Sequence, residues 1–185
     1  VQRLFPEARV MRFDSDRIRG GEHMAADLQR VRDGAVDILV GTQLLSKGHD
    51  FPGVTLVGVI TADTSLNFPD FRAGERTFQL LTQVAGRAGR GEKPGLAIVQ
   101  TYHPEHYAIQ AAARQEFGPF YEMAIGYRKT FRNPPFSQLA KMSYQHTNPI
   151  HARNSALDFV EKFRSFLKDL GITAIDINRP APGYP

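Results

Sequence analysis

Three short apolar runs constrain the fold of this chain more than any other feature of its sequence. They occupy residues 37–42, 54–60 and 96–100, and each is rich in Val, Ile or Leu. Such runs are typical of strands that are buried on both faces of a parallel sheet. Residues 8–13 alternate apolar and polar side chains and predict a fourth strand. The sequence therefore predicts an α/β fold with an open, mainly parallel sheet.

Helices are expected between these strands. Residues 24–31 carry apolar side chains at spacings of four and three, which predicts an amphipathic helix that ends at Asp33-Gly34. A second helix should begin near Glu75 and run towards Gly89. The order strand, helix, strand, loop, strand, helix, strand is that of a right-handedly wound α/β domain.

The rest of the chain predicts a second, smaller domain. Two helices are expected over residues 105–116 and 120–131, and Pro134-Pro135 should end the second one because proline lacks an amide donor. We therefore expect one domain over residues 1–133 and another over residues 134–185.

This second domain is predicted to be a β-α-β piece of an α+β domain. Strands are expected at residues 139–144 and 172–177, on either side of a long amphipathic helix. About fifty residues are few for an independent core. Since the chain also lacks an initiator Met, we expect an excised fragment whose C-terminal domain is truncated.

Composition limits the kinds of site that the chain can hold. It has no cysteine, which excludes disulfides and thiolate metal sites. His103 and His106 have ligand-like spacing, but Pro104 separates them, so a loop that starts a helix is favoured and no metal is expected. No apolar run is long enough to cross a membrane, and no signal peptide is evident, which fits a cytoplasmic location. The net charge of +4 suits a polyanionic partner, although a modest basic excess is common in domains of many kinds.

Residues 83–90 form the most informative polar segment. Gln83, Arg87 and Arg90 are four and three residues apart, so a helix would place them on one face. Gly86 and Gly89 each cost a helix up to about 1 kcal/mol, which indicates a close approach by another group or a helix end. Fixed guanidinium groups suit phosphoryl transfer, because they bind phosphate oxygens bidentately and neutralise charge. A glycine-rich cap with solvated arginines is the alternative, and the full pattern Gln-x-x-Gly-Arg-x-Gly-Arg weighs against it.

A second polar segment follows the strand that ends at Thr42, where open α/β sheets place ligand sites. Thr42 and Ser46 are suited to nucleic-acid phosphates, and Lys47 adds positive charge. Asp50 is suited to a ribose hydroxyl or a metal-bound water. An ordinary loop is the alternative for this segment taken alone.

The two segments together resemble a known family. Residues 41–50 and 83–90 are similar to motifs V and VI in the second RecA-like lobe of superfamily 2 helicases. Residues 12–16, 46–55 and 70–90 further resemble the primosomal protein N′ family of bacterial replication-restart DNA helicases. The likeness is dense from about residue 5 to residue 142.

This resemblance implies roles for matching positions. Arg87 and Arg90 would contact the γ-phosphate of ATP, and Gln83 would position the nucleotide or its attacking water. The positions expected to border the nucleotide are Gly48, Asp50 and Gly86, and those expected near DNA are Thr42, Gln43 and Lys47.

The resemblance also implies that the site is shared. The chain has no Gly-x-x-x-x-Gly-Lys-Ser/Thr loop, so ATP and Mg²⁺ would be held mainly by a first lobe that this chain lacks. The fragment alone is then expected to be inactive. The family's zinc insertion would precede Val1, and no zinc is expected in this chain. Expected partners are forked or single-stranded DNA, the first lobe, single-strand-binding protein and primosome proteins, with no membrane.

Two other functions are compatible with these residues. One is a non-catalytic module that binds nucleic acid or protein on a helicase-like fold. The other is an RNA helicase lobe, against which the likeness over residues 70–76 weighs. Residues 63–76 have no function that the sequence assigns, and we expect Phe68 and Phe71 to pack beneath the loop rather than to stack on bases.

Overall fold

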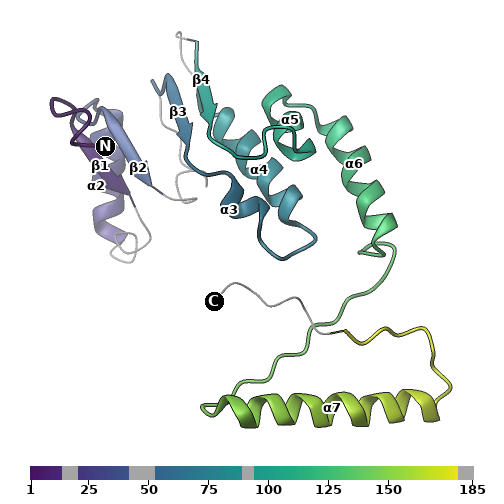
Figure 1. Cartoon of the computed structure of the whole chain (residues 1–185). Helices are drawn as coiled ribbons and strands as arrows, with labels where there is room; N and C mark the ends of the chain where they lie inside the picture. The colour runs from purple at the N-terminus through teal and green to yellow at the C-terminus, as the bar shows by residue number, and fades with distance from the viewer. Residues whose placement is uncertain (14–20, 42–52, 89–93, 179–185) are drawn as a thin grey trace. The chain divides into compact units, whose positions relative to one another are not determined.

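The computed structural model describes residues 1–13, 21–41, 53–88 and 94–178 (Figure 1). It divides into two compact units, Val1–Tyr127 and Arg128–Pro185. The domain boundary that we propose after residue 133 lies just beyond this division. The elements up to the end of α6 are β1 (Val10–Phe13), α2 (Gly21–Arg32), β2 (Ile38–Gly41), β3 (Leu56–Val59), α3 (Asp63–Leu66), α4 (Ala73–Ala85), β4 (Leu96–Val99), α5 (Tyr107–Arg114) and α6 (Phe117–Thr130). The predicted alternation of strands and helices is confirmed.

β1 and β2 form a parallel pair in which Val10 lies opposite Ile38. An ion pair joins their starts, since the Arg9 guanidinium donates to both carboxylate oxygens of Asp37 at 2.8 and 2.6 Å. These hydrogen bonds hold the pKa of the Asp37 carboxyl well below its usual value. The connection through α2 makes this a β-α-β unit.

α2 ends where the sequence predicts. Gly34 has a φ of +68°, a conformation that glycine adopts without steric cost. Its amide donates to the carbonyl of Val31 at 3.1 Å, and the Ala35 amide donates to that of Arg30 at 2.9 Å. These bonds satisfy carbonyl groups that the helix end leaves without partners.

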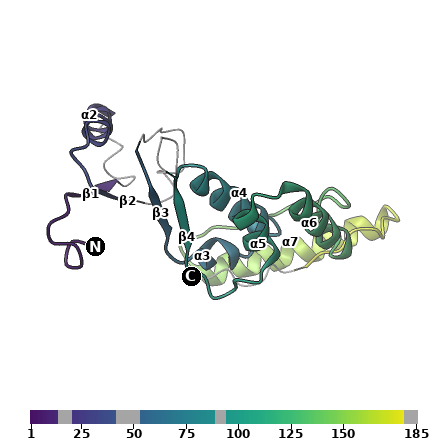
Figure 2. The same cartoon turned by 90° about the horizontal axis from the view of Figure 1, so that it is seen from above.

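β3 and β4 form a second parallel pair, with Leu56 opposite Leu96. Seen from above, α4 and α5 lie on one side of this pair (Figure 2). The other face stays open, since Leu56, Leu96 and Ile98 are 58%, 57% and 54% exposed. The expected burial on both faces is therefore wrong for these strands, because helices among the described residues cover only one face.

The core lies between that covered face and the helices α4, α5 and α6. The Phe78 ring of α4 stacks on Phe120 of α6, with 4.1 Å between centroids. α5 presents alanines to α4, and small side chains let two helix backbones approach closely. The buried members of this core cluster are Ala62, Phe78, Leu81, Ala108, Ile109, Ala111, Ala112 and Phe120.

The second unit contains the predicted long helix, α7 (Pro149–Asp169). The Asn148 side chain caps its start by accepting a hydrogen bond from the Ile150 amide at 2.9 Å. Lys162 pairs with Asp158 at 2.8 Å along an exposed face. The Lys162 side chain is 76% exposed, so this ion pair lies in solvent.

The strands expected at residues 139–144 and 172–177 are not formed. Both segments have extended, alternating sequences, but a strand exists only when a neighbour supplies hydrogen bonds. Within the described part of the chain these two segments pair neither with each other nor with another strand. Between the end of α6 and residue 178, the second unit therefore consists of α7 with an extended segment on either side.

The aromatic stack of the core makes a prediction about stability. Phe78 is 6% exposed, so Phe78→Ala should lower the free energy of unfolding by about 3–5 kcal/mol through lost burial and a cavity. Urea unfolding followed by circular dichroism measures this change. Phe5→Ala is the matched control, since Phe5 is 54% exposed and its loss should cost little. Equal costs for the two variants would contradict this placement of the core.

Candidate functional site

α4 carries the first of the candidate residues and ends earlier than predicted. Its last regular turn closes with the Gly86 amide, which donates to the Thr82 carbonyl at 3.0 Å. The next two amides, of Arg87 and Ala88, reach back three residues to Val84 and Ala85. The chain therefore tightens into a 3₁₀-like turn. The expected continuation to Gly89 is wrong, because the helix stops at Ala85 and Gly86 caps it.

Gln83 and Arg87 lie on either side of the point where the helix ends. Gln83 is exposed on the last turn of α4, and Arg87 is half-buried in the turn that follows. Gly86 is exposed and has a φ of −67°, which any residue adopts. A Cβ there would meet the Thr82 carbonyl oxygen at 3.4 Å, an ordinary contact. The chain's own backbone thus does not demand glycine at this position, and a bare surface is left beside Arg87.

The other candidate residues lie outside the described residues, and their roles stay predictions. They are Thr42, Gln43, Lys47, Gly48, Asp50 and Arg90.

A buried carboxylate, which sequence reasoning missed, fixes the segment that precedes α4. Asp63 is 5% exposed and follows the carboxyl end of β3. It accepts hydrogen bonds from the Thr101 hydroxyl at 3.0 Å and from the Tyr102 amide at 3.1 Å, just beyond β4. Burial raises the pKa of Asp63, but these hydrogen bonds lower it more, so the pKa lies below its usual 3.8. Asp63 thus joins the ends of two neighbouring strands.

The backbone before Asp63 is strained. Thr61 has a φ of 60°, a left-handed conformation that is rare for a β-branched residue. The Ala62 amide donates to the Gln100 carbonyl at 3.0 Å, which holds the chain in this conformation from the β4 side. Strain of this kind persists only where surrounding contacts over-determine it, and it concentrates at functional segments.

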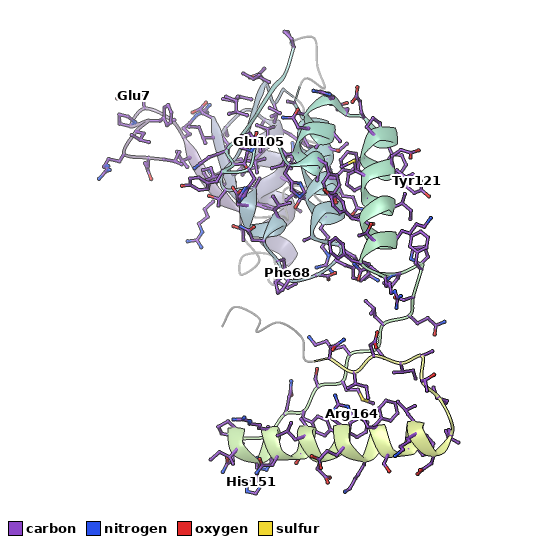
Figure 3. All side chains as sticks on the ribbon, turned by 45° about the vertical axis from the view of Figure 1, so that its right-hand side comes forward. Glu7, Phe68, Glu105, Tyr121, His151 and Arg164 are labelled. Atoms are coloured by element: carbon purple, nitrogen blue, oxygen red, sulfur yellow. The ribbon has the colours of Figure 1, made fainter. Side chains whose placement is uncertain are left out.

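The loop between α3 and α4 places aromatic rings and arginines together. Phe68 is 56% exposed, so the expectation that it packs beneath the loop is wrong. Figure 3 labels its side chain at the outer edge of this loop. The Arg76 guanidinium lies 5.8 Å from the centre of the Phe68 ring, and that of Arg72 lies 4.9 Å from the Phe71 ring. The missed signal is an Arg pair at spacing four beside two phenylalanines.

Asp70 organises this loop. Its carboxylate pairs with Arg76 at 2.8 Å and accepts a hydrogen bond from the Arg72 amide at 2.9 Å. Its carbonyl accepts a hydrogen bond from the Ala73 amide, the first residue of α4, also at 2.9 Å. One residue, through its carboxylate and its main-chain carbonyl, thus holds both the loop and the start of the helix.

Other polar groups are committed to the fold. A cleft of about 220 Å³ is lined by Arg9 and Arg30, but Asp37 and Asp27 pair with these arginines. His106 accepts a hydrogen bond from the Ala108 amide at 3.2 Å and so caps α5, as expected of a loop that starts a helix. Among the described residues no three His, Asp or Glu side chains gather as metal ligands would.

Membrane insertion finds no support in the helices. None of those in the described ranges combines the length and the apolar character that a bilayer span requires.

The sequence of the chain is similar to those of known proteins. The family model of the helicase conserved C-terminal domain matches residues 4–92. Replication restart protein PriA of Bacillus subtilis is 47% identical over 169 residues, which is 91% of this chain and 20% of that protein. The PriA of Treponema pallidum is 42% identical over 156 residues, 84% of this chain and 24% of the relative. That of Borreliella burgdorferi is 34% identical over 169 residues, 91% of this chain and 25% of the relative.

The class of protein follows from the fold and from these matches. Residues 4–92 carry a helicase C-terminal domain, a RecA-like lobe with parallel strands. Over most of its length the chain is 34–47% identical to replication restart protein PriA from these organisms, which supports the expected resemblance to the primosomal protein N′ family. It spans between a fifth and a quarter of the length of these relatives.

The buried carboxylate of Asp63 predicts a pH dependence. Because its folded-state pKa is lowered, Asp63 stabilises the fold above pH 3.8, and this contribution is lost as the pH falls through the folded-state pKa. Asp63→Asn should lower the urea midpoint at pH 6 and should shrink the difference between the midpoints at pH 6 and pH 3. Asp169→Asn, at an exposed position at the end of α7, is the control. An unchanged pH dependence in Asp63→Asn would count against this role.

Proposed function

We propose that this chain is the second motor lobe of an ATP-dependent DNA helicase that acts in replication restart and primosome assembly. The observation that carries the proposal is the segment at the end of α4, where Gln83 and Arg87 flank the exposed Gly86 within the residues that match the helicase domain. The similarity to replication restart protein PriA supports the biological role.

Phosphoryl transfer explains the residue types in this segment. Charge on the γ-phosphate oxygens of ATP must be neutralised as the terminal bond breaks, and a planar guanidinium does this bidentately. In the proposal Arg87 and Arg90 supply that charge, and Gln83 orients the attacking water. Half-burial restrains the Arg87 side chain before ATP arrives, which reduces the entropy lost on binding.

The bare surface at Gly86 fits a nucleotide at this position. The chain's own backbone would tolerate a side chain at Gly86. The proposal therefore explains this glycine by the close approach of another molecule, the nucleotide. In the proposal Gly48, Asp50 and Gly86 border ATP with its Mg²⁺, both held mainly by a first lobe. Thr42, Gln43 and Lys47 contact the phosphates of forked or single-stranded DNA. Single-strand-binding protein and primosome proteins are further proposed partners.

The arginines give the main test. In the full-length protein, Arg87→Ala and Arg90→Ala should each leave ATP binding nearly normal and lower turnover by about a thousandfold, because the charge acts mostly in the transition state. Equilibrium binding of a fluorescent ATP analogue and steady-state phosphate release measure the two quantities.

Arg114→Ala is the matched control, since Arg114 is exposed on α5 and its guanidinium donates a hydrogen bond to Gln110 on the same helix at 3.4 Å. Near-normal turnover in Arg90→Ala and Arg87→Ala would contradict their proposed role. Stimulation of the wild-type protein by structured RNA rather than by forked DNA would favour the RNA helicase alternative.

The shared site makes a second prediction. The 185-residue chain alone should bind ATP weakly and should show no magnesium-dependent hydrolysis, because it has no phosphate-binding loop. Calorimetric titration with ATP and a phosphate-release assay measure this. ATP hydrolysis by the purified chain above that of its Arg87→Ala variant would contradict the proposal that the chain supplies only part of the ATP site.

A further inference from the structure

The loop before α4 presents a surface that the motor chemistry does not use. We define the aromatic–arginine patch as Phe68, Phe71, Arg72 and Arg76, with Asp70 at its centre. Two exposed guanidinium groups lie over two rings, at 4.9 and 5.8 Å from their centres. A single exposed phenylalanine is ordinary on a protein surface. Two rings interleaved with two arginines are the composition of a platform for single-stranded nucleic acid.

We propose that this patch binds single-stranded DNA, with a base stacked on Phe68 and neighbouring phosphates on Arg72 and Arg76. The choice of DNA rests on the proposed helicase function. Phe68 is 56% exposed, so its ring is available to a base without any rearrangement of the core. Phe71 is half-buried, and the Arg72 guanidinium lies over its ring at 4.9 Å from the centre.

The patch is held rigidly from both sides. On the N-terminal side of the patch, Asp63 is hydrogen-bonded to the residues that follow β4. Within the patch, the Asp70 carboxylate pairs with the Arg76 guanidinium at 2.8 Å. The left-handed Thr61 shows that the chain accepts backbone strain to follow this path. A fixed platform binds more tightly than a mobile one, because less conformational entropy is lost when the ligand arrives.

The composition of the patch suits a single strand better than a protein partner. Asp70 and Glu75 lie beside the two arginines, so the local net charge is close to zero. Affinity would then come from stacking on the ring and from individual guanidinium–phosphate contacts. Stacking on an aromatic ring tolerates every base, and a guanidinium adds phosphate contacts with no sequence preference.

The patch and the proposed ATP arginines are separate along α4. The helix has 13 residues and is therefore about 20 Å long. Phe68 and Arg72 precede its first residue, and Arg87 follows its last. A change in the patch can thus be tested without altering the groups proposed to contact ATP.

Single-stranded DNA binding by the full-length protein tests the patch. Phe68→Ala should weaken binding of a fluorescently labelled oligonucleotide by about tenfold, because one base–ring stack is lost. Phe68→Trp should keep the affinity, and Phe68→Leu, which keeps the apolar volume without a ring, should not. Arg72→Gln should lower the slope of log affinity against log salt by about one. Phe5→Ala, at a ring of similar exposure, is the matched control.

ATP turnover without DNA separates this proposal from the motor assignment. It should be unchanged in Phe68→Ala and Arg72→Gln and should fall in Arg90→Ala. If Phe68→Ala and Arg72→Gln both bind DNA as tightly as the wild type, the patch proposal is overturned, whatever the turnover of Arg90→Ala. The patch would then bind a protein partner or serve only to stabilise the loop. Weak DNA binding with a normal Arg90→Ala turnover keeps the patch and removes the motor role.

A second measurement does not depend on the folding of any variant. Single-stranded oligonucleotides that carry 5-iodouracil crosslink under light to aromatic side chains on which the base is stacked. With wild-type protein, mass spectrometry should map the crosslink to the peptide that contains Phe68. Crosslinks confined to other aromatic residues, such as the exposed Tyr121 of α6, would overturn the proposal.

Discussion

The carboxylate of Asp63 joins the end of β3 to the residues that follow β4. The segment that leads to the candidate residues on α4 starts from this connection. Asp63 sits where β3 ends and binds groups that lie just beyond β4, so the two parallel strands share one fixed edge. From this edge the chain turns through α3 and the loop into α4. Without these hydrogen bonds, the buried charge would have no groups to replace the water that it loses on folding, and the fold would be less stable. The path of the loop, and the direction in which α4 starts, therefore depend on this one acidic side chain.

The far end of α4 shows how a short local change redirects the chain. Gly86 stops the helix, and the amides of the next two residues bond back at shorter range. The result is a tight turn that leaves Gly86 exposed beside the half-buried Arg87. Gln83 therefore stays on the last turn of the helix, whereas Arg87 leaves it.

The sequence predicted most elements of the fold because its apolar runs and stripes report local periodicity. It failed for residues 139–144 and 172–177, since alternation shows that a segment can be a strand but does not supply its partner. It misplaced Phe68, because the size of a ring does not reveal that the core is already filled by other aromatic side chains. The role of Asp63 was invisible, as its hydrogen-bond partners lie 38 and 39 residues further along. The pattern of residues 83–90 was recognisable because its chemistry is local.

The continuity of α4 has one further consequence. The helix is a single element of 13 residues that packs against α3, α5 and β3. Asp70 pairs with Arg76 near its start and Gly86 caps its end, so the loop and the turn at Gly86 flank one regular stretch of backbone. A substitution that breaks this helix in the middle would therefore disturb both of its ends together.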